Sequence, residues 1–455
     1  MYYNIPIRLM YVNYDNLCAP AYKEVVILNF DLLHPADQLV MIMERIYGYG
    51  MTTTSGGNLS ILDESGDIWI TPSGVDKGSL TRKDIIQVKP DGTLLGIHKP
   101  SVELPFHAEV YKRRPDIKAV LHAHPPALVS FSIVRKIPNT LLIPNASLIC
   151  GELAMAPYAV PGSAELGEKI AAVFEKGYST VMMENHGVVI GSKNLFRAFM
   201  SFETLDFCAR LEIKANSIGK PTALTQKYIE ISKNKQDIPM EEFTPDYHSS
   251  EERAARQEMC TLIHRSYDQM LFTSTQGTFS QRLSDGSFII TPYGADRKYM
   301  DPSDLVRIKN GKKEAGKVPS RSVPLHQAIY EKHPHINSVI VAHPPNIMAF
   351  AVTDEKFDSR TIPESYIMLR NIPKLPFGCS FMQPQMVADA FSKSTPILMV
   401  ENDCLIVTGA SLLNAFDRLE VAEYSAKAVI ASKALGPLIT ISDDEVAEIE
   451  EAFNL

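Results

Sequence analysis

Two long stretches of this sequence have the same order of residue types. Residues 98–127 read HKPSVELPFHAEVYKRRPDIKAVLHAHPPA, and residues 317–346 read KVPSRSVPLHQAIYEKHPHINSVIVAHPPN. A second pair, STVMMENHGVVIGS at 179–192 and PILMVENDCLIVTG at 396–409, repeats at a similar separation. A unit of about 200 residues is an ordinary domain size. The sequence therefore predicts a tandem duplication of one domain.

The repeat divides the chain into four segments. Residues 35–221 are expected to form the first copy and residues 251–455 the second. Residues 222–250 are polar, with Lys-Asn-Lys-Gln-Asp and Thr-Pro-Asp, and are expected to link the copies. Residues 1–34 are an N-terminal extension, for which the sequence offers no functional interpretation.

Helical and strand patterns alternate within the first copy, which predicts an α/β fold. Apolar residues at helical spacing predict one helix over 35–49 and another over 163–176, with Ser163 as the N-cap of the second. Runs such as LSIL, IWIT and IKAVLHAH read as strands, and Gly-rich turns separate them.

Two histidines in the run IKAVLHAH are the first candidates for chemistry. His122 and His124 are two residues apart, so a strand would place both imidazoles on the same face. An isolated pair of this kind is weak evidence, because most such pairs bind nothing. The context strengthens it, since Glu103 precedes the pair and His186 follows in Asn-His-Gly. Three imidazoles and one carboxylate can hold a catalytic Zn²⁺ ion.

Five motifs in the first copy carry a resemblance to a known family. In order they are Ser55-Gly56-Gly57-Asn58-Leu59-Ser60, Thr71-Pro72-Ser73-Gly74, Pro100-Ser101-Val102-Glu103, His122-Ala123-His124 and Asn185-His186-Gly187. With these motifs the chain resembles the class II aldolase/adducin family, to which L-fuculose-phosphate aldolase belongs. The resemblance implies a three-layer α/β/α fold, with a central, mostly antiparallel sheet flanked by helices, present twice.

The resemblance also implies an activity in carbohydrate metabolism. It implies a lyase that cleaves a ketose phosphate or related sugar by reversible retro-aldol chemistry through a metal-stabilised enediolate. Glu103 would bind the metal with the three histidines and also move the proton. Zn²⁺ is the expected ion, with Mn²⁺, Co²⁺ or Fe²⁺ as alternatives. The expected phosphate pocket consists of Gly57, Asn58, Ser73, Gly74 and Ser101.

One departure leaves the substrate open. The family's second serine in Pro-Ser-Ser-Glu is Val102 here, which removes a phosphate donor. A dehydratase, decarboxylase or epimerase of the same fold is an alternative to the aldolase. A third reading is a non-enzymatic, adducin-like assembly protein, which would lack the metal ligands.

The second copy has lost most of these residues. Ser322, Val341 and Asp403 stand where the first copy has Glu103, His122 and His186, and His343 alone keeps its histidine. Thr278 replaces Asn58, and Tyr293 replaces Ser73, where its ring is expected to fill the phosphate pocket. We therefore expect the second copy to be catalytically inactive. In the family the active site lies between neighbouring subunits, so the resemblance implies that an inactive copy can still supply a wall to an active one.

A tyrosine in the second copy is a candidate for a shared site. In the family a neighbouring subunit donates a tyrosine that acts as proton donor, and Tyr366 in the segment 361–366 is the candidate here. The first-copy region 137–141, taken as its counterpart, has no tyrosine. Tyr366 could instead be an interface packing residue. A homodimer would then form a pseudo-four-fold ring, and larger assemblies are possible.

Charge and cysteine content narrow the class of protein. The net charge is −8, which argues against a nucleic-acid or membrane-surface partner. No apolar run approaches 18 residues, and the N-terminus has no signal-peptide pattern. Six cysteines without a Cys-x-x-Cys motif indicate reduced thiols. A cytoplasmic protein acting on a small sugar or sugar phosphate is expected.

Overall fold

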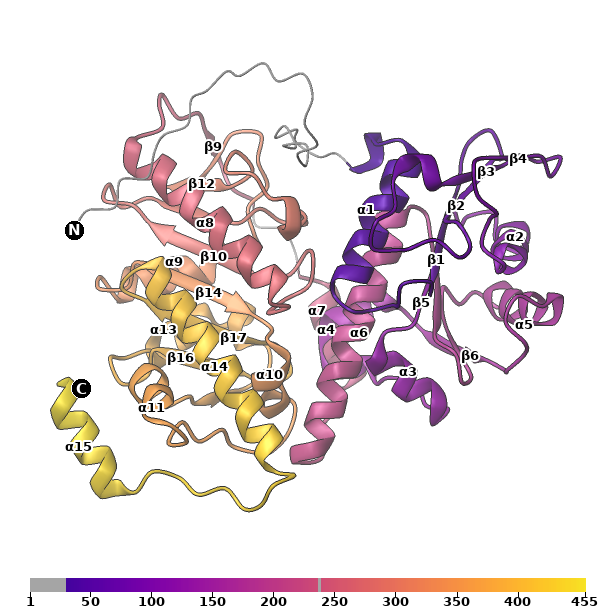
Figure 1. Ribbon diagram of the computed structural model, residues 1–455. Coiled ribbons are helices and arrows are strands. Elements are labelled where there is room, and N and C mark those ends of the chain that lie inside the picture. The colour runs from indigo at the N-terminus through magenta and orange to yellow at the C-terminus, as the bar shows by residue number, and fades with distance from the viewer. Residues whose placement is uncertain (1–29, 236–238) are drawn as a thin grey trace, which may run out of the picture.

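Each half of the chain builds one sheet with helices on its faces (Figure 1). The computed structural model describes residues 30–235 and 239–455, so most of the expected N-terminal extension, residues 1–29, lies outside the described residues. The first copy runs from indigo to magenta in Figure 1, and the second from pink to yellow. The expected α/β fold, present twice with mostly antiparallel sheets, is confirmed.

The first sheet has the strand order β4-β3-β2-β1-β5-β8-β7-β6. Every neighbouring pair in it is antiparallel except β6 and β7, which are parallel. Its strands are β1 (Asn58–Leu62), β2 (Ile68–Ile70), β3 (Ile86–Val88), β4 (Leu94–Leu95), β5 (Ala119–Ala123), β6 (Leu153–Ala156), β7 (Thr180–Met183) and β8 (Val188–Ser192).

The second sheet repeats this order strand for strand as β13-β12-β11-β10-β14-β17-β16-β15, and adds β9 beyond β13. Identical connectivity in both halves is the structural form of the duplication. Its strands are β9 (Glu242–Phe243), β10 (Thr278–Arg282), β11 (Phe288–Ile290), β12 (Val306–Lys309), β13 (Lys312–Glu314), β14 (Ser338–Ala342), β15 (Lys374–Leu375), β16 (Ile397–Val400) and β17 (Cys404–Gly409).

The helices follow the sequence patterns closely. Ser163 caps the helix after it by accepting from Leu166 N at 3.1 Å, and Gly177 ends that helix region with a φ of 101°. The first copy contains α1 (Pro35–Gly48), α2 (Leu104–Arg113), α3 (Pro126–Ile133), α4 (Pro144–Cys150), α5 (Ala164–Glu175) and α6 (Leu195–Ile218). Short 3₁₀ helices lie at Phe30–Leu32, Arg82–Asp84, Thr140–Leu142 and Arg297–Tyr299.

The second copy contains more helices than the first in the described residues, and its last helix, α15 (Asp443–Phe453), follows the repeated unit. Its other helices are α8 (Ser250–Asp268), α9 (Val323–Lys332), α10 (Pro345–Ala351), α11 (Pro363–Leu369), α12 (Cys379–Met382), α13 (Pro384–Ala390) and α14 (Leu412–Ser432). None of the helices in the described ranges is both long and apolar enough to cross a membrane.

The expected linker is folded against its neighbours where the structure describes it. Residues 222–250 contain α7 (Gln226–Lys233), and Leu224 and Ile229 pack with Phe377 of the second copy. Strand β9 from the same segment pairs in parallel with β13. The segment therefore extends the second sheet as well as joining the copies.

One apolar cluster contains buried residues of both copies. Buried side chains of α6, including Phe207 and Leu211, belong to the same cluster as Met259 and Ile263 of α8. Burial of this much apolar surface favours a fixed arrangement of the two halves over independent motion.

A buried arginine crosses the same boundary. Arg45 of α1 donates to Asp296 at 2.6 Å and to the Tyr267 hydroxyl at 2.5 Å, both in the second copy. Tyr267 in turn donates to Glu203 of α6 at 2.5 Å. The guanidinium also lies over the Phe199 ring, 4.4 Å from its centroid. This network supplies directional contacts within an otherwise apolar interface.

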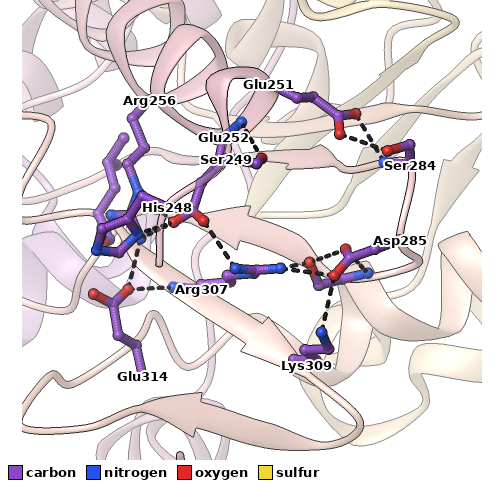
Figure 2. Close-up of polar contacts among 12 residues, drawn as sticks. His248, Ser249, Glu251, Glu252, Arg256, Ser284, Asp285, Arg307, Lys309 and Glu314 are labelled. Carbon is purple, nitrogen blue, oxygen red and sulfur yellow. Dashed lines mark hydrogen bonds and ion pairs between the residues drawn. The ribbon is translucent and has the colours of Figure 1, made fainter. Parts of the chain in front are cut away.

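A second ionic cluster lies inside the second copy (Figure 2). Glu252, fully buried in the first turn of α8, accepts from Arg256 at 2.7 Å and from Arg307 of β12 at 2.8 Å. Arg256 also donates to Glu314 at the end of β13, and Arg307 to Asp285, each at 2.7 Å. The cluster fastens α8 to the sheet edge that β9 extends.

Candidate metal centre

Three histidines meet at the end of the first sheet. His122 is the fourth residue of β5, and His124 follows the strand's end. β8 pairs with β5 so that Val189 stands opposite His122, which brings the turn before β8, with His186, over the same end. Asn185 in this turn adopts a left-handed φ of 53°, a conformation that asparagine tolerates better than most residues. Glu103 lies immediately before α2.

The geometry of these side chains suits a single ion. One ring nitrogen of each of His122, His124 and His186 lies within 4.8 Å of the others. Glu103 contributes an oxygen on each side, with Oε2 3.3 Å from His122 Nε2 and Oε1 3.7 Å from His186 Nε2. These are separations that an ion at the centre would bridge, because Zn–N and Zn–O bonds are about 2 Å long.

Unsatisfied atoms support this interpretation. His122 Nδ1 donates to the Val188 carbonyl oxygen at 2.9 Å, which leaves its Nε2 with a free lone pair. Within the described residues, His122 Nε2, His124 Nε2 and Glu103 Oε1 are buried and have no hydrogen-bond partner. Buried polar atoms are normally paired. These residues therefore fit a divalent cation as their missing partner.

Burial favours the neutral form of the three imidazoles, which is the form that binds a metal ion. Burial, together with the nearby His186, lowers the pKa of His122 to about 3. Burial, followed by His122 and His186, likewise lowers the pKa of His124 to about 3. Burial also lowers the pKa of His186, against the attraction of Glu103. All three rings are thus neutral near pH 7, the form in which imidazole binds metals.

A chain of hydrogen bonds stands behind Glu103. Asn58 Nδ2 donates to Glu103 Oε2 at 2.7 Å, and its Oδ1 accepts from His107 Nε2 at 2.5 Å. His107 Nδ1 lies 2.6 Å from Ser60 Oγ, which lies 2.6 Å from the Tyr111 hydroxyl. The sequence carried a signal for this chain, since Asn58 and Ser60 share one face of β1, while His107 and Tyr111 share one face of α2.

The loops predicted to bind phosphate lie beside the histidines. A bridge between Pro72 and Pro100 joins the Ser73–Gly74 loop to the Ser101 loop. Ser101 Oγ accepts from Glu103 N at 3.3 Å. Gly57, at φ 70°, has no room for a side chain, because a Cβ would lie 2.9 Å from the His122 carbonyl oxygen. Asn58, by contrast, has its amide committed to Glu103 and His107. The phosphate-binding role of these residues stays a prediction.

Tyr366 does not join this group within one chain. It lies on α11, on the second half of the molecule (Figure 1), and its hydroxyl donates to Glu450 Oε1 of α15 at 2.6 Å. The alignment of its segment with residues 137–141 was wrong, because α4 occupies the equivalent place between a helix and the edge strand. Ser147 of α4 is the counterpart of Tyr366, so the first copy still has no tyrosine there.

The second copy keeps a cavity where the first has its centre. Ser322, Val341, His343 and Asp403 line a cavity of about 370 Å³. In the described part of the second copy, no three potential ligands converge. The expectation that Tyr293 fills this pocket was wrong. Its ring is 50% exposed at the rim, with the Arg321 guanidinium 4.4 Å from the ring centroid, so the interior stays open.

The protein thus has a duplicated α/β fold, and its first copy contains three histidines arranged so that they could bind one metal ion. The chain belongs to the family described as "Class II Aldolase and Adducin N-terminal domain", which matches residues 37–213 and 257–430. The resemblance seen in the sequence is therefore confirmed, including its occurrence in both halves.

Named relatives match about one copy of the chain. The chain is 32% identical over 200 residues to a 5-deoxy-D-ribulose 1-phosphate aldolase of Bacillus thuringiensis, covering 43% of this chain and 91% of the relative. It is 32% identical over 178 residues to a 3-oxo-tetronate 4-phosphate decarboxylase of Pectobacterium atrosepticum, covering 38% and 81%. A solved L-fuculose 1-phosphate aldolase is 29% identical, with a TM-score of 0.40 and coverage of 44% and 95%.

Proposed function

We propose that this protein is a divalent-metal-dependent lyase that cleaves a carbon–carbon bond of a small sugar phosphate or related sugar. The observation that carries the proposal is the set of unpartnered, buried atoms of His122, His124 and Glu103 beside His186. Zn²⁺ is the favoured ion, with Mn²⁺, Co²⁺ or Fe²⁺ as alternatives, because the donors are three imidazoles and one carboxylate. Relatives that act on sugar phosphates support the substrate class.

In this proposal the three histidines bind the metal ion and Glu103 transfers the proton. His122, His124 and His186 hold the ion, which when bound polarises carbonyl and hydroxyl oxygens of the substrate as a Lewis acid. Glu103 moves the proton. Asn58 fixes its Oε2, while Oε1 has no hydrogen-bond partner among the described residues and is the oxygen available to a substrate hydroxyl.

We place the phosphate of the substrate at the loops of Gly57, Ser73, Gly74 and Ser101. Backbone N–H groups of such loops, together with serine hydroxyls, suit an oxyanion that needs several donors. Val102, which is 65% exposed, offers no donor where the family has serine. We infer a phosphate held by fewer contacts than in the family pattern.

A second chain would complete this site. Within one chain, α4 of the first copy borders the cavity of the second copy through Pro144 and Leu148. Asn402 of the second copy holds that region by donating to the Leu142 carbonyl oxygen at 2.8 Å. By the equivalence of the copies, α11 of a second molecule would cover the first-copy centre, and we propose that Tyr366 reaches the centre from this helix. We propose a homodimer with a pseudo-four-fold arrangement, in which the Tyr366 hydroxyl leaves Glu450.

The test of the activity combines metal analysis with turnover. We expect about one Zn²⁺ per chain in purified protein, and aldehyde release from at least one member of a panel of ketose phosphates. Glu103→Gln should abolish aldehyde release. Protein that binds no divalent metal and turns over no substrate would favour the adducin-like assembly role. Tyr366→Phe with unchanged kcat would remove the proton-donor role and leave Tyr366 as a packing residue.

Decarboxylation is the second candidate function. A tetronate-phosphate decarboxylase relative supports it, and the same centre would serve a 3-oxo acid by polarising its carbonyl oxygen. Release of CO₂ from a 3-oxo acid phosphate, without aldehyde release from any ketose phosphate, would select this reaction.

Five free, buried cysteines in the described residues fit a reducing compartment, and we propose the cytoplasm as the location of the protein.

A further inference from the structure

The cavity of the second copy, which the proposed reaction does not use, has the features of a ligand site. It measures about 370 Å³, a size that suits a small organic ligand. Its walls come from both copies, with α4 of the first copy on one side and the loops of the second on the other. Loss of the catalytic residues has left this space open.

The backbone of the loops around this cavity keeps the shape of the first copy. Gly277 has a φ of 78° and Gly294 a φ of 70°, against 70° and 66° for their counterparts Gly57 and Gly74. The turn that carried His186 is also retained, since Asn402 has a φ of 51° where Asn185 has 53°. Backbone N–H groups that suit an oxyanion are therefore preserved where the metal ligands are not.

The side chains around the cavity have changed in charge. Where the first copy has Glu103, the second copy has Ser322, so a carboxylate is absent. Where the first copy has Val102, the second copy has Arg321, which adds a guanidinium. Lys235, just beyond α7, adds an ammonium group that lies 3.6 Å from the centroid of the Phe381 ring. Asp403 is the one carboxylate that lines the cavity among the described residues, and it already accepts from Ser380 Oγ at 2.5 Å. Cations thus outnumber anions at this cavity.

A polar atom in the wall also lacks a partner. His343 Nδ1 is buried and has no hydrogen-bond partner within the described ranges. The hydroxyl-bearing side chains Thr278, Ser320 and Ser322 line the same cavity. A ligand with hydroxyl groups and an anionic head would satisfy both kinds of wall.

We propose that the second copy is a metal-free binding site for a phosphate monoester of a small polyol or sugar. Lys235 and Arg321 would contact the phosphate, while the hydroxyl side chains and His343 would contact the polyol. Because α4 of the first copy forms one wall, a bound ligand would also stabilise the pairing of the two copies. This site is separate from the proposed metal centre and does not depend on it.

The experiment uses the full chain after removal of metal with EDTA, with calorimetric titration of glycerol 3-phosphate and, separately, of inorganic phosphate. We expect one binding event that belongs to the second copy, and any further event at the phosphate loops proposed for the first copy is told apart from it by the Ser101→Asp variant. Lys235→Ala combined with Arg321→Ala should weaken the second-copy event at least tenfold, whereas Lys233→Ala, which removes one positive charge from an exposed position on α7, should leave it unchanged. Tighter binding of glycerol 3-phosphate identifies the ester as the ligand, and equal binding identifies the free anion.

A matched pair of variants locates the ligand. Ser320→Asp should abolish the second-copy event by placing a carboxylate in that cavity, whereas Ser101→Asp at the corresponding first-copy position should leave the second-copy event unchanged. Melting temperatures of all variants establish that they are folded. The proposal is overturned by the absence of binding, by loss of binding in Ser101→Asp but not in Ser320→Asp, or by equal weakening in Lys233→Ala.

Discussion

Asn58 donates from its side-chain Nδ2 to Glu103 Oε2 at 2.7 Å, although the two residues are 45 positions apart in the chain. The same amide accepts from His107, so its orientation is fixed from behind. With Oε2 held in this way, Oε1 is directed toward His186. The second copy lacks this arrangement, because Thr278 and Ser322 replace the pair, and there His326 Nε2 is left buried without a partner in the described residues.

We expect Asn58→Thr, the residue of the second copy, to lower kcat by about 10- to 100-fold, the usual effect of removing a group that orients a metal ligand. The substitution removes the donor to Glu103 and the acceptor for His107. Steady-state kinetics with the identified substrate and a competition titration for metal affinity measure the effect. Asn216→Thr, the same change on an exposed face of α6, is the control and should match wild type. Wild-type kcat in Asn58→Thr would show that the hydrogen bond to Glu103 is dispensable.

Buried neutral histidines make the metal-free protein sensitive to acid. The pKa values of His122 and His124 are lowered to about 3, and burial lowers the pKa of His326 to about 3 as well. In the unfolded chain these imidazoles titrate near pH 6.5, so between about pH 6.5 and 3 the unfolded state binds more protons. The free energy of unfolding should therefore be highest above pH 6.5 and fall as the pH decreases through this window.

Denaturant unfolding in EDTA at a series of pH values from 7.5 to 4.5 measures this slope. His326→Gln, which removes one such imidazole away from the metal centre, should give a shallower dependence on pH than wild type. Addition of Zn²⁺ should raise the free energy of unfolding at pH 7.5, because the ion binds the folded centre. An identical pH slope in wild type and His326→Gln would contradict this assignment of acid sensitivity.

Local sequence patterns were sufficient for much of the fold. Strand alternation predicted that His122 and His124 share a face, and the structure brings both rings to one point. The repeat predicted two copies of one topology, and the matching strand orders follow it. These features depend on residues that are close in sequence or on a comparison of the chain with itself.

Features that depend on distant partners could not be predicted in this way. Nothing near Arg45 in the sequence indicates that its partner is Asp296, 251 residues away. The size of Tyr293 suggested a filled pocket, but Arg321 stacks on its ring at the rim. Tyr366 was aligned with the wrong segment because the sequence motifs are sparse there, and the correct counterpart is clear from the order of the helices.

Arg45→Ala should destabilise the whole chain by about 3–5 kcal/mol, because it leaves Asp296 and the Tyr267–Glu203 pair facing an apolar interface without their cation. Urea unfolding followed by circular dichroism measures the change. Arg82→Ala is the control, since the ion pair of Arg82 with Asp37 is 3.4 Å long and both side chains are substantially exposed. That control should cost less than about 1 kcal/mol. Equal effects of the two substitutions would show that the buried network contributes nothing beyond a surface ion pair.

Glu252 is the residue on which the ionic cluster of the second copy depends (Figure 2). Its two oxygens accept from Arg256 and Arg307, and its side chain is fully buried. Glu252→Gln keeps the shape but leaves two guanidinium groups facing a neutral amide, which should cost about 3–5 kcal/mol. The neighbouring Glu251 accepts from Ser284 at an exposed position, so Glu251→Gln should cost less than about 1 kcal/mol.

Hydrogen exchange localises this effect within the chain. The cluster joins α8 to β12 and β13, so Glu252→Gln should speed amide exchange in those three elements and leave β5 and β8 of the metal centre unchanged. A uniform increase across both copies would mean that the two halves unfold as one cooperative unit. That outcome would agree with their shared apolar core and would contradict the local role assigned to Glu252.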